Sequence, residues 1–179
     1  EATSVDAPQL ADALAVAASG RLDRARLLAE DPAFMGRREA WRSVPDRLDG
    51  TGAAVAVVVA EIQELIDGSQ IPLATRHKVE LEDLDEREKA LGTRGSGRRQ
   101  VVERQRREVR RLRDDELRFG LATLSRRYLD WATVCDPSVG STAGLEATER
   151  ITGATAELTR NPNEPLLLQA LFLDLPAIG

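Results

Sequence analysis

One stretch of the sequence, residues 98–131, constrains the fold more than any other. It reads RRQVVERQRREVRRLRDDELRFGLATLSRRYLDW and contains no proline. Apolar residues in its second half recur every three or four positions, which places them on one face of a helix; they are Leu117, Leu121, Leu124, Tyr128 and Trp131. Gly120 is a cost that such a helix tolerates. The pattern predicts one long helix, solvated where it begins and buried where it ends, with other helices packed around the buried end.

Helical periodicity bounded by proline and glycine also marks the rest of the chain. An aspartate followed within two residues by a proline indicates helix starts at Asp6 and Asp31, and Pro45 is expected to kink or end the second of these helices. The run VAVVVA at 55–60 is typical of a strand when taken alone, but the apolar spacing over 53–66 follows a helical face. A helix over 141–158 is expected to turn one side inward, lined by Leu145, Thr148, Ile151, Thr155 and Leu158. We therefore expect an all-α fold.

Residues 76–115 carry opposite charges on either side of a glycine-rich turn. A helix over 71–91 is acidic between Glu80 and Glu88, residues 92–97 break it, and the arginine run follows. We expect an antiparallel helical hairpin in which the acidic arm neutralises the basic arm, although each exposed pair contributes only a few tenths of a kcal/mol. The alternative is a free-standing nucleic-acid-binding module that uses the run beginning at Arg94 and ending at Arg113. Two observations oppose it, the matching acidic arm and the net charge of −5.

Residues that carry out chemistry are scarce. The sequence has no GxxxxGK[ST] or GxGxxG phosphate-binding motif. His77, the only histidine, lies between Arg76 and Lys78 and is predicted to be a surface residue. Cys135, the only cysteine, forms no internal disulfide and is predicted to be a small buried apolar residue. We therefore expect no catalytic residue, no metal and no cofactor. With no membrane span or signal peptide in view, we expect a cytoplasmic protein.

The last helix is predicted from Asn161-Pro-Asn-Glu-Pro165 onward and is apolar nearly all round. Such a helix must be buried, either by its own domain or by a partner. We expect one face to serve the core of the chain and the other to contact a partner subunit. The candidate contact residues are Leu166, Leu167, Leu171, Phe172, Leu173 and Leu175.

Three stretches together resemble the C-terminal part of clamp-loader delta-prime subunits of bacterial DNA polymerase III, in their actinobacterial form. They are SGRLDRARLLAEDP at 19–32, RREVRRLRDDELRFGLATLSRRYLD at 106–130 and NPNEPLLLQALFLDLP at 161–176. The third stretch is the most specific of them. The resemblance implies that residues 1–31 are the end of a small helical lid and that residues 32–179 are a helical collar, with the charged hairpin at about 76–115 as a departure from the family.

The resemblance also implies a function. Clamp-loader collars pack together in a ring of subunits, and delta-prime subunits are rigid, non-hydrolysing partners of the ATP-hydrolysing subunits. The chain is then a structural part of the complex that loads the sliding clamp on DNA, with an ATPase-like module upstream. Its partners are the other loader subunits, and it contacts DNA weakly or indirectly. Arg24 lies where some lids place a nucleotide-sensing arginine; in delta-prime subunits we expect a packing or solvent-facing role for it.

Overall fold

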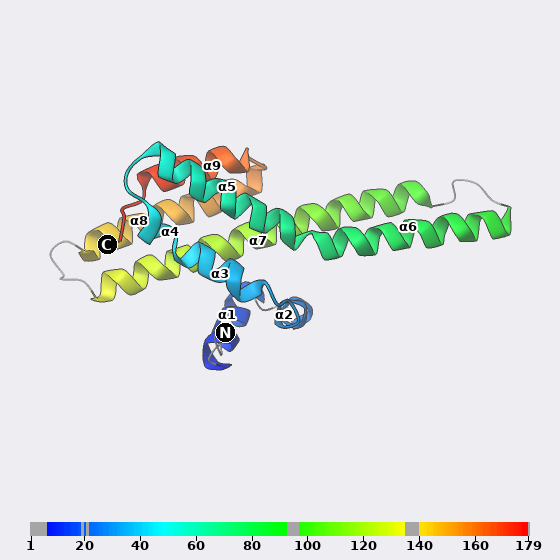
Figure 1. Ribbon diagram of the computed structural model, residues 1–179, viewed down its shortest axis with the longest axis horizontal. Coiled ribbons are helices and arrows are strands. Elements are labelled where there is room, and N and C mark those ends of the chain that lie inside the picture. The colour runs from blue at the N-terminus through cyan, green and yellow to red at the C-terminus, as the bar shows by residue number, and fades with distance from the viewer. Residues whose placement is uncertain (1–6, 19, 21, 93–96, 135–139, 179) are drawn as a thin grey trace.

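The structure, a computed structural model, describes residues 7–18, 20, 22–92, 97–134 and 140–178. Every regular element among these residues is a helix, so the prediction of an all-α fold is confirmed. The helices are α1 (Ala7–Ala18), α2 (Leu22–Ala29), α3 (Phe34–Arg42), α4 (Val44–Arg47), α5 (Gly52–Ser69), α6 (Ile71–Leu91), α7 (Arg98–Val134), α8 (Gly140–Glu157), the short 3₁₀ helix η1 (Leu158–Arg160) and α9 (Glu164–Asp174). Figure 1 shows a bundle at one end of the molecule and the α6–α7 hairpin projecting from it.

Helix α7 runs through both parts of the molecule. Its second half packs against α8, and α9 and α5 complete the bundle around the core. The predicted stripe is confirmed, because Leu117, Leu121, Leu124 and Tyr128 are buried and Trp131 is half-buried beside them. The predicted change from a solvated start to a buried end is confirmed as well.

A second, smaller core joins α1 and α2 to the rest. Phe34 at the start of α3 stacks on Phe119 of α7, with ring centroids 5.1 Å apart. These two rings lie with Ala13, Ala17 and Leu28 in one apolar cluster, apart from the main core. The boundary between a lid at 1–31 and a collar at 32–179 stays a prediction.

Small residues allow two close approaches between helices. A Cβ added to Gly120 of α7 would lie 1.9 Å from Cε2 of Trp41 on α3, so the indole ring occupies the space that a side chain would need. A Cβ added to Gly144 of α8 would lie 2.6 Å from the Cβ of Ala132 on α7. Gly120 is therefore part of the packing rather than only a tolerated cost in a long helix.

A buried ion pair links α3 to the middle of α7. Nε of Arg37 donates to Oε2 of Glu116 at 3.0 Å, and both side chains are almost completely buried. Nη1 of Arg37 also lies 2.7 Å from Oδ2 of Asp31, the residue predicted to begin this helix. Asp31 accepts a hydrogen bond from the backbone of Ala33, and the helix itself begins at Phe34.

The chain ends against the bundle. The hydroxyl of Tyr128 donates to the backbone oxygen of Pro176 at 2.6 Å, and the backbone N–H of Ile178 donates to the oxygen of Pro45 at 3.1 Å. Leu175 and Ile178 are buried in the same core. The segment after α9 therefore helps to hold the bundle together.

Of the remaining sequence predictions, those for α5 and Pro45 are confirmed and the one for Leu145 is wrong. Residues 55–60 lie in α5, as expected, and Pro45 lies in the first turn of a new helix, α4, after α3 has ended. The prediction that Leu145 faces inward is wrong, because α8 turns Ala147 and Ile151 toward the core and leaves Leu145 exposed. Leu158, which begins η1, is buried as predicted. Residues 135–139 lie outside the described part of the chain, so the predicted burial of Cys135 lies outside it too.

Candidate functional site

The terminal helix α9 has one buried side and one exposed side. Oδ1 of Asn163 accepts a hydrogen bond from the backbone N–H of Leu166 at 3.2 Å, which caps the start of the helix. Leu166 is 61% exposed and Leu173 is 52% exposed. Ala170 lies between them and is also exposed. Spacings of four and three residues place these three on one face, which we call the α9 outer face.

The opposite side of α9 belongs to the core. Leu168, Leu171 and Phe172 are buried, and the ring of Phe172 meets Trp41 edge to face at a centroid distance of 6.3 Å. Of the six predicted subunit contacts, Leu171, Phe172 and Leu175 are buried and Leu167 is half-buried against the core. The two remaining candidates, Leu166 and Leu173, are exposed. Contact with a partner through them stays a prediction.

The α6–α7 hairpin contains a polar layer where a two-helix seam is usually apolar. Nε2 of His77 lies 2.8 Å from Oε2 of Glu108. Nε2 of Gln105 donates to the backbone oxygen of His77 at 3.2 Å and to Oε2 of Glu80 at 2.9 Å. The prediction that His77 is a surface residue is wrong, since its side chain is buried between the two helices. Polar groups within an otherwise apolar seam fix the register of paired helices.

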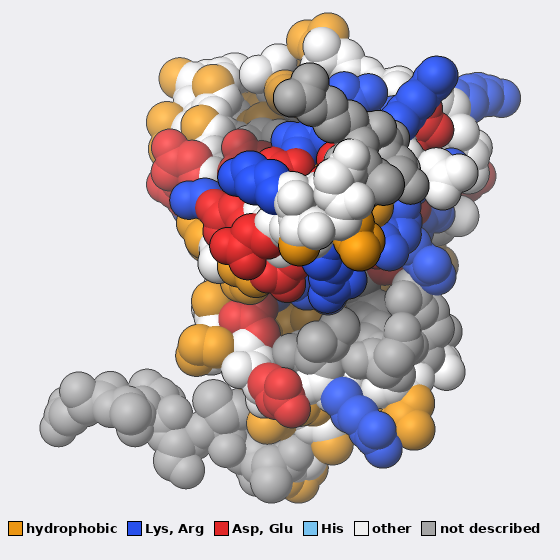
Figure 2. Space-filling model, turned by 90° about the vertical axis from the view of Figure 1, so that its right-hand side faces the viewer, with side chains coloured by type: hydrophobic (Ala, Val, Ile, Leu, Met, Phe, Trp, Pro, Cys, Tyr) orange, Lys and Arg blue, Asp and Glu red, His pale blue; other side chains and the backbone are white. Residues whose placement is uncertain are grey.

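Charges face each other across the hairpin, as predicted. Arg98 pairs with Asp85 and Arg104 with Glu80, while Nη2 of Arg76 lies 2.9 Å from Oε2 of Glu108. Figure 2 looks toward the tip of the hairpin and shows acidic and basic side chains next to each other. Where the hairpin joins the bundle, Arg113 pairs with two carboxylates of the bundle, Asp67 and Glu164. Ion pairs therefore link the two helices of the hairpin to each other and link the hairpin to the bundle.

The same contacts change the acidity of two carboxyl groups. A hydrogen bond from Arg104, followed by one from Gln105, lowers the pKa of Glu80. The hydrogen bond from His77 is the largest effect at Glu108, and together with the contact to Arg76 it lowers the pKa of that carboxyl against the smaller opposing effect of desolvation. An ionised Glu108 accepts hydrogen bonds only, so Nε2 of His77 carries the shared proton.

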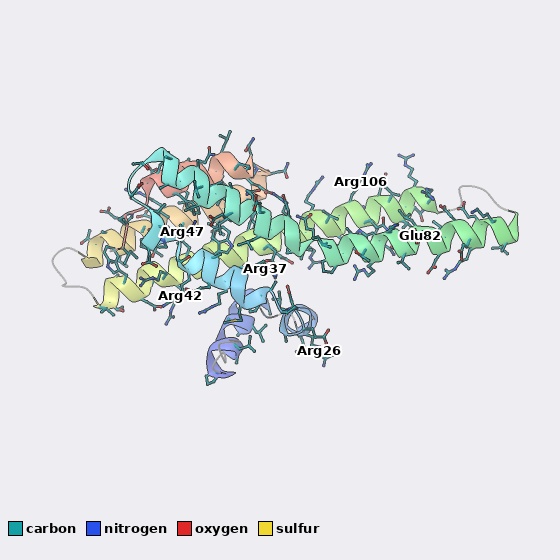
Figure 3. All side chains as sticks on the ribbon, viewed as in Figure 1. Arg26, Arg37, Arg42, Arg47, Glu82 and Arg106 are labelled. Carbon is teal, nitrogen blue, oxygen red and sulfur yellow. The ribbon has the colours of Figure 1, made fainter. Side chains whose placement is uncertain are left out.

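Four arginines of α7 remain outside this network. Arg106, Arg107, Arg110 and Arg111 are exposed, and within the described ranges none of them forms an ion pair. Figure 3 shows Arg106 extending from α7 on the side away from α6. We call these four residues the arginine cluster. The acidic arm therefore neutralises the basic arm only in part, which the sequence alone did not indicate.

The other candidate residues do not assemble into a site. Arg24 belongs to α2, but its side chain lies outside the described part, as do residues 93–96 with Arg94. Over the described residues, no group of three or more His, Cys, Asp or Glu side chains is arranged to hold a metal ion. An open groove between α6 and α7 is lined by both signs of charge, among them Arg87 and Asp83.

Comparison with known proteins identifies no family for this chain. No family model, curated protein or solved structure matches the chain. Within the described part, none of the helices combines the length and the apolar character needed to cross a membrane.

Proposed function

We propose that the chain is the C-terminal, non-catalytic part of a clamp-loader subunit of the delta-prime type. In this function it is a cytoplasmic structural element that assembles with the other loader subunits, which load the sliding clamp on DNA during replication. The resemblance of three stretches to this family supports the proposal. Those stretches include α2, much of α7, and α9 with its cap.

The observation that carries the proposal is the α9 outer face. Leu166 and Leu173 remain in solvent although the same helix buries Leu168, Leu171 and Phe172. Burying a leucine side chain is worth about 1.5–3 kcal/mol, so a partner that covers the outer face gains from both exposed leucines. Collar subunits that pack side by side would supply such a partner.

Under this proposal the chain binds no nucleotide by itself. Hydrolysis of ATP belongs to neighbouring subunits and requires no catalytic residue here. Arg24 remains the one candidate for contact with a nucleotide, by its place in the resemblance alone. Calorimetric titration of the chain with Mg-ATP is expected to give no binding in the micromolar range.

Alanine substitutions on α9 test the proposal. The double variant Leu166→Ala/Leu173→Ala is expected to keep the melting temperature of the chain and to reduce co-purification with the other loader subunits. A matched variant, Leu22→Ala/Leu145→Ala, removes two exposed leucines from other helices and is expected to leave assembly unchanged. Leu168→Ala is expected to cost about 2–5 kcal/mol of stability, because the side chain is fully buried.

The outcome that contradicts the proposal is equally specific. If the subunits co-purify with the Leu166→Ala/Leu173→Ala variant as well as with the unchanged chain, the α9 outer face is not a subunit contact. If the unchanged chain joins no loader subunit at all, the assignment to the clamp loader is wrong.

A further inference from the structure

We propose that the arginine cluster of α7 binds the phosphate backbone of double-stranded nucleic acid without reading its sequence. The cluster consists of Arg106, Arg107, Arg110 and Arg111. This inference goes beyond the proposed function and does not depend on it, since it concerns the hairpin and not the α9 outer face.

Part of the positive charge of the hairpin is not neutralised by carboxylates. Residues 76–115 hold 13 of the 25 basic and 10 of the 30 acidic residues of the chain, so the hairpin is basic while the rest of the protein is acidic. Within the hairpin, Arg98 and Arg104 are paired with carboxylates of α6, and Arg113 is paired with the bundle. Among the arginines that α7 contributes to the described hairpin, those without an ion pair are therefore the four of the arginine cluster.

The arginine cluster is compact and is held at a fixed place on α7. Residues four apart on a helix lie about 6 Å apart along its axis, so the four side chains form a compact patch of about two turns. Guanidinium groups donate in a planar fork that matches phosphate oxygens. The patch is held in place from both sides, by Arg113 on the bundle and by Gln105 in the buried polar layer. Phosphate binding therefore requires little reorganisation of the backbone.

The chemistry of the face that carries the cluster favours phosphate over a protein or a lipid surface as the ligand. No exposed residue of α7 from 98 to 111 is apolar, because Val101, Val102 and Val109 are partly buried. Stable protein interfaces have an apolar centre, and helices that lie in a membrane surface have an apolar face. A purely polar, arginine-rich face fits a phosphate backbone better than either.

The composition of the hairpin favours a duplex over a single strand as the ligand. Proteins that hold single strands stack the bases on aromatic side chains. The hairpin has no aromatic residue other than His77, which is buried. Contacts to phosphate alone carry no sequence information directly, so we expect binding that is independent of sequence.

The number of arginines sets the expected salt dependence. Contacts to about four phosphates of B-form DNA give a slope of log K against log [salt] of about −3.6, equivalent to a loss of about 150-fold between 50 and 200 mM salt. Binding is therefore expected to be clear at 50 mM salt and close to lost at 200 mM.

The test uses the full chain and a labelled 20-base-pair DNA duplex, with fluorescence anisotropy as the readout. The variant Arg106→Gln/Arg107→Gln/Arg110→Gln/Arg111→Gln removes the cluster. The matched control is Arg26→Gln/Arg42→Gln/Arg126→Gln/Arg160→Gln. It removes four exposed arginines on other surfaces of the protein and changes the net charge by the same amount. Arg26 and Arg42 are labelled in Figure 3. Circular dichroism establishes that both variants keep their helices.

We expect the cluster variant to lose at least about tenfold in affinity at 50 mM salt and to show a much smaller salt slope. The control is expected to stay within about threefold of the unchanged chain. Equal losses in both variants would overturn the proposal, because net charge alone would then explain binding. Tighter binding to a single strand of the same length, or equally tight binding to polyglutamate, would overturn it as well.

Discussion

Replacing Gly120 by alanine tests the closest helix contact in the bundle. In the middle of an exposed helix, alanine in place of glycine stabilises by up to about 1 kcal/mol. At Gly120 the added methyl group would lie 1.9 Å from Cε2 of Trp41 and 2.3 Å from two further ring atoms. Carbon atoms in contact are normally about 3.5–4.0 Å apart, so α3 and α7 must separate or the indole must move.

The size of the effect follows from what surrounds the ring. Trp41 is 2% exposed and packs edge to face on Phe172, so it has no open space to enter. Overpacking of this kind typically costs about 1–3 kcal/mol of stability. Because a whole indole ring must be displaced, we expect a cost near the upper end of this range. After the gain in helix propensity is subtracted, we expect a net loss of about 2 kcal/mol and a melting temperature lower by about 4–8 °C.

Thermal unfolding followed by circular dichroism measures this shift, with Gly153→Ala as the control. Gly153 lies in α8 and is exposed, and a methyl group added there would have no neighbouring atom within 4 Å. We expect that variant to gain about 0.5–1 kcal/mol. In a Trp41→Leu background, Gly120→Ala is expected to lose most of its cost, since the two residues are in contact. A rise in melting temperature for Gly120→Ala in the unchanged chain would refute the reasoning.

Two further predictions concern charged groups. Arg37→Met is expected to cost about 3–5 kcal/mol in urea unfolding, because it removes the guanidinium that donates to the buried Glu116 carboxylate, and the double variant Arg37→Met/Glu116→Leu is expected to cost less than the single one. The pKa values of Glu80 and Glu108 lie below the ordinary 4.5, so both groups stabilise the fold above that pH and lose this contribution as the pH falls through the lower folded values. Between about pH 5 and pH 3, stability should therefore fall less in Glu80→Gln/Glu108→Gln than in the unchanged chain.

The elements themselves were predictable from local patterns. The stripe from Leu117 to Tyr128 follows helical spacing, and no proline interrupts it, so the long helix required no knowledge of its neighbours. The same holds for α5, where spacing over a wide window outweighs the strand preference of consecutive valines. The hairpin was predictable from its glycine-rich turn, where Gly92 ends α6 in the left-handed conformation.

Which face of each helix is buried was less predictable, because packing partners that are distant in the sequence determine it. Leu166 and Phe172 are both apolar residues of one all-round apolar helix, and only the positions of α5 and α8 leave the first exposed and the second buried. His77 has charged neighbours in sequence, yet the register of the hairpin places it in the seam. The contact of Gly120 with Trp41 has no local signal at all.

Helix α7 belongs to the projecting arm and to the core at once, and this has a mechanical consequence. From Leu124 in the core to Arg98 at the end of the arm, the helix spans about 39 Å at 1.5 Å per residue. A rotation of about 5° about its buried end displaces the far end by about 3 Å over that length. Small changes in the packing of Leu121 or Leu124 are therefore magnified along the arm, and a load applied to the arm acts as a torque on the centre of the bundle.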